Sequence, residues 1–215
     1  MVYRRCLSLV IACVFLLQVD IIDVARTENV SVDVYYECMC PFSVNFVIKQ
    51  LWPTYKKLGD HMEVRLYPYG NARTRTHKDG NGRATDIISC QHGPRECEGN
   101  TVQCCVLDLF RDTATQVGFV ACMMSARHPY EAGPQCASEM CLPWHLISQC
   151  ASSSYGKTLL KEMGRKTRQA VPPVRAVPHI VINGQHNGYY TGRARSNLTS
   201  LICDLLKQKP SPCRA

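Results

Sequence analysis

The first regular pattern of apolar and polar residues in the chain lies at residues 30–37. This stretch, VSVDVYYE, places β-branched and aromatic side chains at alternate positions, which predicts a β-strand. Residues 42–58 follow with apolar side chains at helical spacing, namely Phe42, Phe46, Val47 and Leu51. Pro41 stands where a helix tolerates proline in its first turn, and Pro53 is expected to kink or end that helix.

The pattern changes after a second strand, which we predict at residues 61–70. Residues 71–86 are polar and contain glycine, so we expect a loop there. Residues 90–150 are dense in cysteine and mostly helical in pattern, with the clearest apolar face at residues 101–124.

Strand signals return near the C-terminus. Residues 179–182, HIVI, are typical of a buried strand, and Asn183-Gly184 predicts a tight turn into another short strand. Residues 194–209 then predict an amphipathic helix. Its apolar face carries Leu198, Leu201, Ile202, Leu205 and Leu206.

The predicted order of elements is therefore β-α-β, a helical block, and then β-β-α. This is the order of an α/β protein with a thioredoxin-like fold that carries an insertion. We expect a single such domain over residues 30–210. The helical insertion is predicted at about residues 71–170, between the N-terminal β-α-β part and the C-terminal β-β-α part.

The N-terminus carries a basic head followed by an uncharged apolar run at residues 6–19. That run has the length of a signal-peptide core and is short for a membrane span, so residues 1–25 are predicted to be a signal peptide. A retained signal anchor is the alternative, because Asp23 makes the cleavage site after Ala25 poor. No transmembrane span is expected once the signal is removed. The sequons at Asn29 and Asn197 are predicted glycosylation sites in this secretory setting.

Cysteine is unusually frequent, with 14 among 215 residues, which argues against an ordinary cytosolic protein. Ten cysteines outside the signal peptide and the segment around residue 40 allow five structural disulfides, so we expect a disulfide-rich insertion. These ten are Cys90, Cys97, Cys104, Cys105, Cys122, Cys136, Cys141, Cys150, Cys203 and Cys213. A zinc site is not favoured, because the chain lacks paired Cys-x-x-Cys units, and neither a metal nor a bound cofactor is expected.

The formal net charge of +8 is concentrated in basic stretches at residues 70–83, 164–169 and 191–195. Two interpretations remain open: solvated loops that keep the protein soluble, or loops that attract anionic glycans and acidic cell surfaces. Nucleic acid is not an expected partner, because these stretches lack interleaved aromatic residues and a binding motif.

Residues 36–43, YECMCPFS, contain the candidate chemistry. Cys40 lies at a predicted strand-to-helix junction, where unpaired N–H groups favour the thiolate, the species that attacks a disulfide. Pro178 directly precedes the buried strand at residues 179–182, the place of the cis-proline that packs against the active-site turn in thioredoxin-like folds. A structural half-cystine is the alternative role for Cys40.

A longer motif, CQHGPRECEGNTVQCC at residues 90–105, fits the pattern Cys-Gln-His-Gly-x-x-Glu-Cys-x-x-Asn-x-x-x-x-Cys at every fixed position. This resembles the signature of the gamma-interferon-inducible lysosomal thiol reductase family. The resemblance extends to VYYE, CP, PYGNA, CVLD and VPHIVING and spans most of residues 32–213. It implies a thioredoxin-like fold with a disulfide-laced helical insertion. It also implies reduction of disulfides in protein substrates, often at acidic pH in endosomes or lysosomes.

The resemblance assigns Cys40 to the nucleophilic first cysteine of the family's Cys-x-x-Cys motif, whereas Ser43 replaces the second. Three outcomes follow. An external thiol such as glutathione or free cysteine resolves the mixed disulfide, or Cys38 resolves it from the same face of an extended strand, or the centre does not turn over. The alternative role for Cys38 is a structural one, with a bond to another cysteine of the chain.

Two histidines lie near the candidate chemistry. His92 is interpreted as an internal hydrogen-bonding residue. For His179 two alternatives stay open: a protonated imidazole near Cys40, or a surface histidine.

The first functional hypothesis is a secreted or endolysosomal thiol–disulfide oxidoreductase with a single nucleophilic cysteine. The alternative is a catalytically inactive secreted protein that binds a protein or cell-surface partner.

Overall fold

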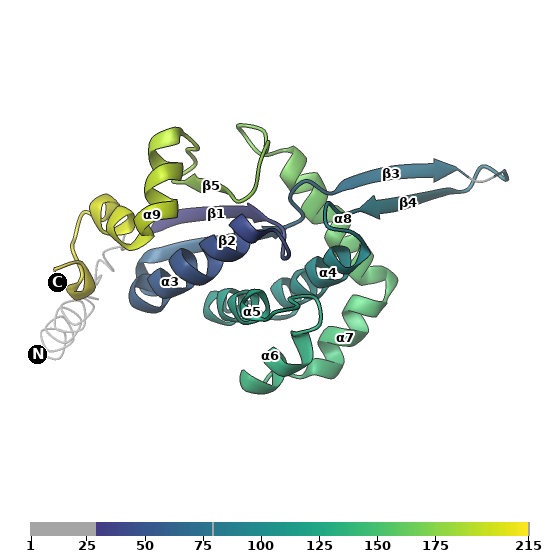
Figure 1. The fold of residues 1–215 in the computed structure, drawn as a ribbon, viewed down its shortest axis with the longest axis horizontal. Helices are drawn as coiled ribbons and strands as arrows, with labels where there is room; N and C mark the ends of the chain where they lie inside the picture. Colours follow the sequence, from purple (N-terminus) through teal and green to yellow (C-terminus); the bar gives the residue numbers. More distant parts are fainter. Residues whose placement is uncertain (1–28, 79, 215) are drawn as a thin grey trace, which may run out of the picture.

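The computed structural model describes residues 29–78 and 80–214, and within them a three-stranded sheet joins the two ends of the chain (Figure 1). Strand β1 (Val30–Tyr36) is central. Strand β2 (Met62–Pro68) pairs with it in parallel, and β5 (His179–Ile182) pairs with its other edge in antiparallel fashion. The predicted signal peptide lies outside the described residues.

A helical segment connects β1 to β2, as a parallel pair requires. It comprises α2 (Pro41–Phe46), the π-helical stretch η1 (Val47–Leu51) and α3 (Trp52–Leu58), and a short 3₁₀ turn, η2 (Gly59–His61), leads into β2. Of the two alternatives for Pro53, an end of the helix was wrong, because α3 continues to Leu58, and a kink there stays a prediction. The π-helical turn η1 comes before this proline. Proline has no N–H to donate, and the π-helical turn changes the hydrogen-bonding pattern at that point of the helix.

Helix α9 (Gly188–Leu205) packs against β5 and η1, and it bends at Asn197, which has non-helical backbone angles. The chain then ends in a 3₁₀ turn, η3 (Ser211–Cys213). Most of the apolar positions that predicted these elements meet in one core, whereas Phe42 is exposed. That core contains Val32, Val34, Phe46, Leu51, Ile180, Leu198, Leu201 and Ile202, all at most 1% exposed.

The insertion between β2 and β5 begins with a hairpin and continues with helices. The hairpin strands are β3 (Arg73–Lys78) and β4 (Ala84–Ser89). The helices are α4 (Pro94–Leu109), α5 (Thr113–Ser125), α6 (Gly133–Glu139), α7 (Trp144–Ser152) and α8 (Ser154–Arg168). A second core packs the helices α4, α5, α6 and α7 against one another. It contains Cys105, Val106, Phe119, Met123, Ala137 and Ile147.

This architecture confirms the predicted thioredoxin-like α/β fold with a helical insertion. Two element predictions were wrong. The loop expected at residues 71–86 is the β3–β4 hairpin. The second C-terminal strand is reduced to a single bridge between Ile182 and Gln185, because the chain enters α9 directly after the Asn183-Gly184 turn.

Disulfides form largely within the insertion. The described residues contain four: Cys90–Cys97, Cys105–Cys150, Cys122–Cys136 and Cys203–Cys213. The expected fifth bridge is absent from this part of the chain, and the assignment of Cys104 and Cys141 to disulfides was wrong. Cys104 is buried against the carbonyl of Pro68, whereas Cys141 is exposed after α6, so the two thiols lie in different environments.

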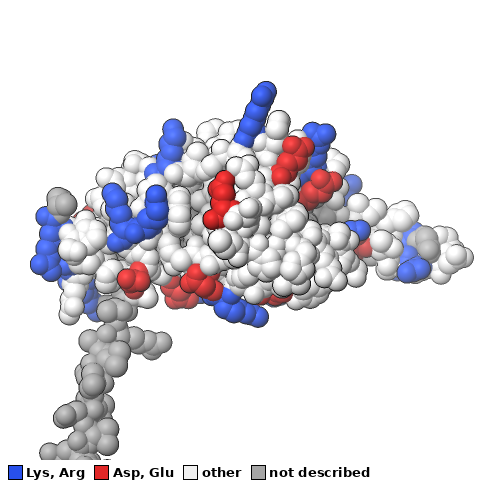
Figure 2. Space-filling model, turned by 90° about the horizontal axis from the view of Figure 1, so that it is seen from below, with Lys and Arg blue, Asp and Glu red and all other residues white. Residues whose placement is uncertain are grey.

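The basic stretches predicted as loops belong mainly to regular elements. Residues 73–78 form β3, residues 164–168 end α8, and residues 191–195 lie in α9. The hairpin and α9 are at opposite ends of the molecule in Figure 1. Lys and Arg side chains are spread over the face shown in Figure 2, with acidic side chains between them. Among the described helices, none combines the length and apolar character needed to cross a membrane.

Candidate active site

Cys40 lies where the chain turns from β1 into α2, which confirms the predicted junction. Its backbone N–H donates to the carbonyl of Glu37 at 3.3 Å, and its carbonyl accepts from the N–H of Val44 at 2.9 Å. It occupies the N-cap position of α2, and its side chain makes no capping hydrogen bond. Its thiol is not part of a disulfide, and the residue is 6% exposed. Cys40 therefore stands at a helix start, where backbone N–H groups have no partner within the helix.

The segment before β5 lies against this cysteine. The Val177–Pro178 peptide bond is cis, and the Cys40 Sγ is 4.0 Å from the carbonyl oxygen of Val177. Arg195 of α9 donates from Nη2 to the Pro178 carbonyl at 3.0 Å. The cis bond to Pro178 thus lies beside Cys40, where the sequence predicted it.

Ser43 occupies the position where a second cysteine would stand. It lies three residues after Cys40, so it follows by about one helical turn, and it is fully buried. Its Oγ has no hydrogen-bond partner among the described groups. Phe42 beside it is 73% exposed, so the site presents one large apolar side chain to solvent.

Cys38 does not lie where the sequence argument placed it. Strand β1 ends at Tyr36, so Cys38 belongs to a turn, and the premise that it shares a strand face with Cys40 was wrong. Its Sγ is 3.6 Å from the Glu96 carbonyl, and its backbone N–H donates to Asn100 Oδ1 at 3.0 Å. Burial, with the nearby Glu96 carboxylate adding to it, raises the pKa of the Cys38 thiol far above its usual range. Both features count against Cys38 as the resolving thiol.

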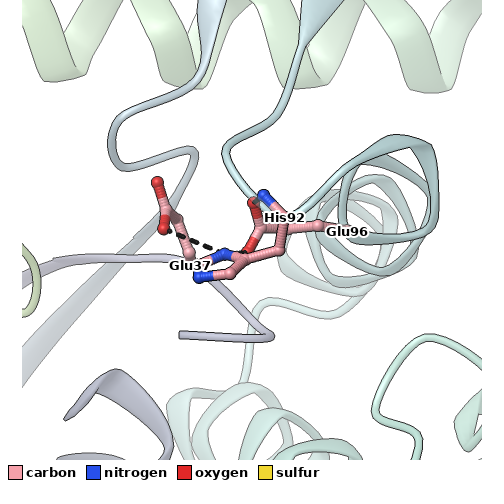
Figure 3. A group of neighbouring side chains, drawn as sticks. All are labelled: Glu37, His92 and Glu96. Carbon is pink, nitrogen blue, oxygen red and sulfur yellow. Dashed lines mark hydrogen bonds and ion pairs between the residues drawn. The ribbon is translucent and has the colours of Figure 1, made fainter. Parts of the chain in front are cut away.

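The sequence signature holds the active-site turn in place (Figure 3). Glu96, in the first turn of α4, accepts from the His92 backbone N–H at 3.0 Å and lies 2.5 Å from His92 Nδ1 through its other oxygen. His92 Nδ1 is also 3.6 Å from Glu37 Oε2. Glu37 and Glu96 are both fully buried. These contacts confirm His92 as a hydrogen-bonding residue, but it lies at the surface and not in the interior as predicted.

Three further polar contacts fasten the same turn. Asn71, in the loop after β2, donates its backbone N–H to Glu37 Oε1 at 2.5 Å and its side-chain amide to Gln91 Oε1 at 2.6 Å. The Tyr36 hydroxyl donates to Gln103 Oε1 at 2.9 Å. The signature is therefore largely a docking surface for the turn, a role that sequence reasoning missed.

Comparison with known proteins agrees with this site. The family model described as "Gamma interferon inducible lysosomal thiol reductase (GILT)" matches residues 31–140. The gamma-interferon-inducible lysosomal thiol reductase of Carassius auratus is 37% identical over 192 residues, which cover 87% of this chain and 73% of the relative. The chain belongs to the GILT family. GILT-like protein 1 of Drosophila melanogaster is 32% identical over 219 residues, which cover 94% of this chain and 85% of the relative.

Among solved structures, this GILT-family chain is similar to the oxidoreductase DsbA from Xylella fastidiosa. The TM-score is 0.46 at 14% identity, and the match covers 81% of this chain and 85% of that one. Membership in the GILT family places the chain among thiol–disulfide oxidoreductases, which act on disulfide-containing proteins. Ser43 is the point where this member departs from the Cys-x-x-Cys motif.

The donor atoms of Glu37, His92 and Glu96 lie within 4.8 Å of one another, close enough to be considered as metal ligands. However, the 2.5 Å separation between His92 Nδ1 and Glu96 Oε2 is a hydrogen-bond distance, so a shared proton accounts for the contact. The expectation of no metal in this GILT-family protein stays a prediction.

His179 corrects both sequence alternatives. It is buried at 3% exposure, stacks on the His186 ring at 3.7 Å between centroids, and meets Tyr35 edge-on. Burial, with the neighbouring His186, lowers the pKa of His179 to about 4. The imidazole is therefore neutral at pH 5 and above and supplies no cation to Cys40.

The predicted glycosylation sites are both accessible. Asn29 precedes β1 and is exposed, and Asn197 is exposed at the bend of α9. Asn197 also accepts from the Ser200 N–H through Oδ1 at 2.9 Å, which caps the second half of the helix. Attachment of glycans at these positions stays a prediction.

Glu37 gives the site a pH dependence. Burial and the Glu96 carboxylate raise the pKa of Glu37 from 4.5 to about 7, against the opposing effects of the Asn71 N–H and His92. The remaining titratable group close to this carboxyl is the buried Cys38 thiol. Because the folded-state pKa is the higher one, the stability linked to Glu37 is fully present below about pH 4.5. It is lost as the pH rises through about 7.

We therefore expect the free energy of unfolding to fall between pH 4.5 and pH 7.5 more steeply in the wild-type protein than in Glu37→Gln, whose amide mimics the protonated carboxyl. Urea unfolding across this pH range measures the difference. Glu63→Gln, at an exposed glutamate of β2, is the control and should keep the wild-type slope. Parallel curves for wild type and Glu37→Gln would contradict the assignment.

Proposed function

We propose that this GILT-family chain is a thiol–disulfide oxidoreductase that reduces disulfides of protein substrates through Cys40 alone. An external small thiol, glutathione or cysteine, serves as the reductant. The proposed location is the extracellular space or the lumen of endosomes and lysosomes. The observation that carries the proposal is the arrangement of three side chains. Cys40 is unbonded at a helix start beside Pro178, Ser43 fills the resolving position, and Cys38 is buried against α4.

The reaction follows from this arrangement. The Cys40 thiolate attacks one sulfur of the substrate disulfide, forms a mixed disulfide, and releases the other substrate sulfur as a thiolate. An external thiolate then attacks the Cys40 sulfur and releases the second substrate sulfur. A second external thiol restores Cys40 and leaves as the oxidised dimer of the small thiol. Two small thiols are oxidised for each substrate disulfide that is reduced.

The site residues have separate tasks in this scheme. The first turn of α2 offers N–H groups to the negative charge on the Cys40 sulfur. The Val177 carbonyl lies against that sulfur, so the cis-peptide segment bounds the space that an incoming disulfide must enter. Phe42 offers an exposed apolar contact for the substrate beside it.

The competing function is binding without turnover, which the missing thiol at Ser43 favours. The bound molecule would be a protein or a cell-surface partner. Anionic glycans that bind to the basic stretches are a further candidate. Turnover of a disulfide-bonded protein, measured with the purified mature chain, separates the two functions.

We expect the wild-type rate to rise in proportion to the small-thiol concentration, because the external thiol performs the resolving step. Cys40→Ser is expected to abolish the rate, whereas Cys38→Ala should leave it close to wild type, because the Cys38 thiol takes no part in the reaction. The measurement is run at pH 5 and pH 7. Wild-type turnover no greater than that of Cys40→Ser would contradict the enzyme and favour the binding protein. A Cys38→Ala variant that folds but loses turnover would contradict the single-cysteine mechanism.

A further inference from the structure

A groove with a volume of about 960 Å³ lies in the insertion, between β4 and helices α4, α7 and α8. Helix α4 separates it from the active-site turn. Glu98, Thr101 and Val102 of this helix line the groove, whereas Glu96 and Asn100 contact the turn. The two regions are therefore opposite sides of one helix.

One wall of the groove is the edge of a β-strand. Residues 85–88 are consecutive in β4, and all of them line the groove. Successive side chains of a strand point to opposite faces, so four lining residues in a row fit a strand whose edge faces that space. Strand β4 pairs with β3 along one edge, and within the described residues no strand pairs with its other edge. The Ile88 carbonyl lies 3.8 Å from Cys97 Sγ, and the rest of the unpaired edge offers backbone N–H and C=O groups to a further strand.

The rest of the groove is mainly apolar. Val102, Trp144 and Leu160 form its walls, and Ile87 is 52% exposed at its rim. Charges of both signs line it. Glu98 and Glu131 are acidic, Lys157 is basic, and Lys161 is paired with Asp86 of β4. An occupant therefore needs apolar side chains and an extended backbone rather than a strong charge.

We propose that this groove binds an extended polypeptide segment that adds as a strand to the open edge of β4. Main-chain hydrogen bonds supply affinity in this mode, and pockets for alternate side chains supply selectivity. The six residues of β4 span about 20 Å, enough to pair with a segment of similar length. A dedicated site for extended chain fits a substrate that is at least locally unfolded around its disulfide.

The position of the groove suits such a substrate. An α-helix with its side chains is about 10–12 Å wide, and three or four extended residues span that distance. A chain bound in the groove is therefore separated from the active-site turn by the width of α4. This assignment of the substrate rests on the proposed function, whereas binding of the segment itself requires no turnover.

Peptide binding to the full mature chain carrying Cys40→Ser tests the proposal independently of catalysis. The probe is a fluorescent, cysteine-free eight-residue peptide of alternating valine and threonine, read by anisotropy. The same peptide N-methylated at alternate residues is the matched probe, because methylation removes the N–H donors that pair with a strand edge. We expect the first peptide to bind and the methylated one to bind at least about tenfold more weakly.

Ile87→Asp is expected to weaken peptide binding by about tenfold or more, because it places a charge at the apolar rim. Leu109→Asp is the matched control at an exposed apolar residue outside the groove lining, and it should bind the peptide as the parent does. Equal binding of both peptides, or equal effects of both substitutions, would overturn the proposal. Self-association of the parent that Ile87→Asp abolishes would overturn it too, since a second copy of the chain would then occupy the edge. Peptide binding by the Cys40→Ser chain, together with no turnover by the wild-type chain, would count against the proposed function alone.

Discussion

Replacement of Ser43 by cysteine is expected to speed release of substrate from the Cys40 mixed disulfide at about 1 mM glutathione by about 100-fold or more, since an intramolecular attack replaces a bimolecular one. The attack leaves a disulfide between Cys40 and the introduced thiol, which two glutathione molecules then reduce. Ser43 is buried and about one helical turn from Cys40, so the new thiol lies on the correct side of the helix start. The wild-type dependence on small-thiol concentration should weaken in the same variant. Initial rates over a series of glutathione concentrations measure both effects.

Ser43→Ala is the matched control for this substitution. The Ser43 Oγ has no hydrogen-bond partner among the described groups, so loss of the hydroxyl should leave turnover at the wild-type rate. A marked loss in Ser43→Ala would show that the hydroxyl takes part in the reaction. A Ser43→Cys variant that folds but reduces no faster than wild type would show that the position cannot resolve the Cys40 adduct.

Loss of the Cys105–Cys150 disulfide is expected to be the most destabilising change among the bridges. This bond joins α4 to α7 across a sequence separation of 45 residues, and both of its residues lie in the core of the insertion. In the chain-entropy model, a closed loop of that length stabilises the fold by about 4 kcal/mol. Urea unfolding of the double variant Cys105→Ala/Cys150→Ala measures the loss.

The Cys203–Cys213 bridge provides the comparison, because it closes a loop with a separation of only 10 residues. The same model gives a loss of about 2.7 kcal/mol in the free energy of unfolding for Cys203→Ala/Cys213→Ala. This double variant should therefore unfold at a higher urea concentration than Cys105→Ala/Cys150→Ala. The reverse order would mean that local packing, rather than loop length, dominates the contribution of these bonds.

Elements with a buried face could be predicted from the sequence, and the β3–β4 hairpin could not. Strand β1 alternates buried and partly buried residues, and all four residues of β5 are buried, so both leave clear apolar patterns. Nearly every side chain of β3 is exposed, and no apolar alternation is left to detect. The glycines at positions 80 and 82 mark the turn of this hairpin, and the sequence argument interpreted them as part of a loop.

The residues of the active site also divide into those that the sequence predicts and those that it does not. Cys40 and Pro178 are recognisable because their places depend on neighbouring residues and on the order of elements. The burial of Cys38 depends on Asn100, which lies 62 residues away and comes from a different part of the fold. One local signal was available. His92, Glu96 and Asn100 recur every fourth residue, and Glu96 and Asn100 share the face of α4 that meets the active-site turn.

The contacts between α4 and the turn limit how this scaffold can be engineered. Designers often treat the loop that carries a nucleophile as an exchangeable module on a constant framework. Here Glu37 and Cys38 stand three and two residues before Cys40, and their partners are His92, Glu96 and Asn100 of the insertion. A loop transplanted from a thioredoxin without this insertion would leave those buried polar groups without partners. The active-site loop and the insertion therefore have to be exchanged together when this fold is redesigned.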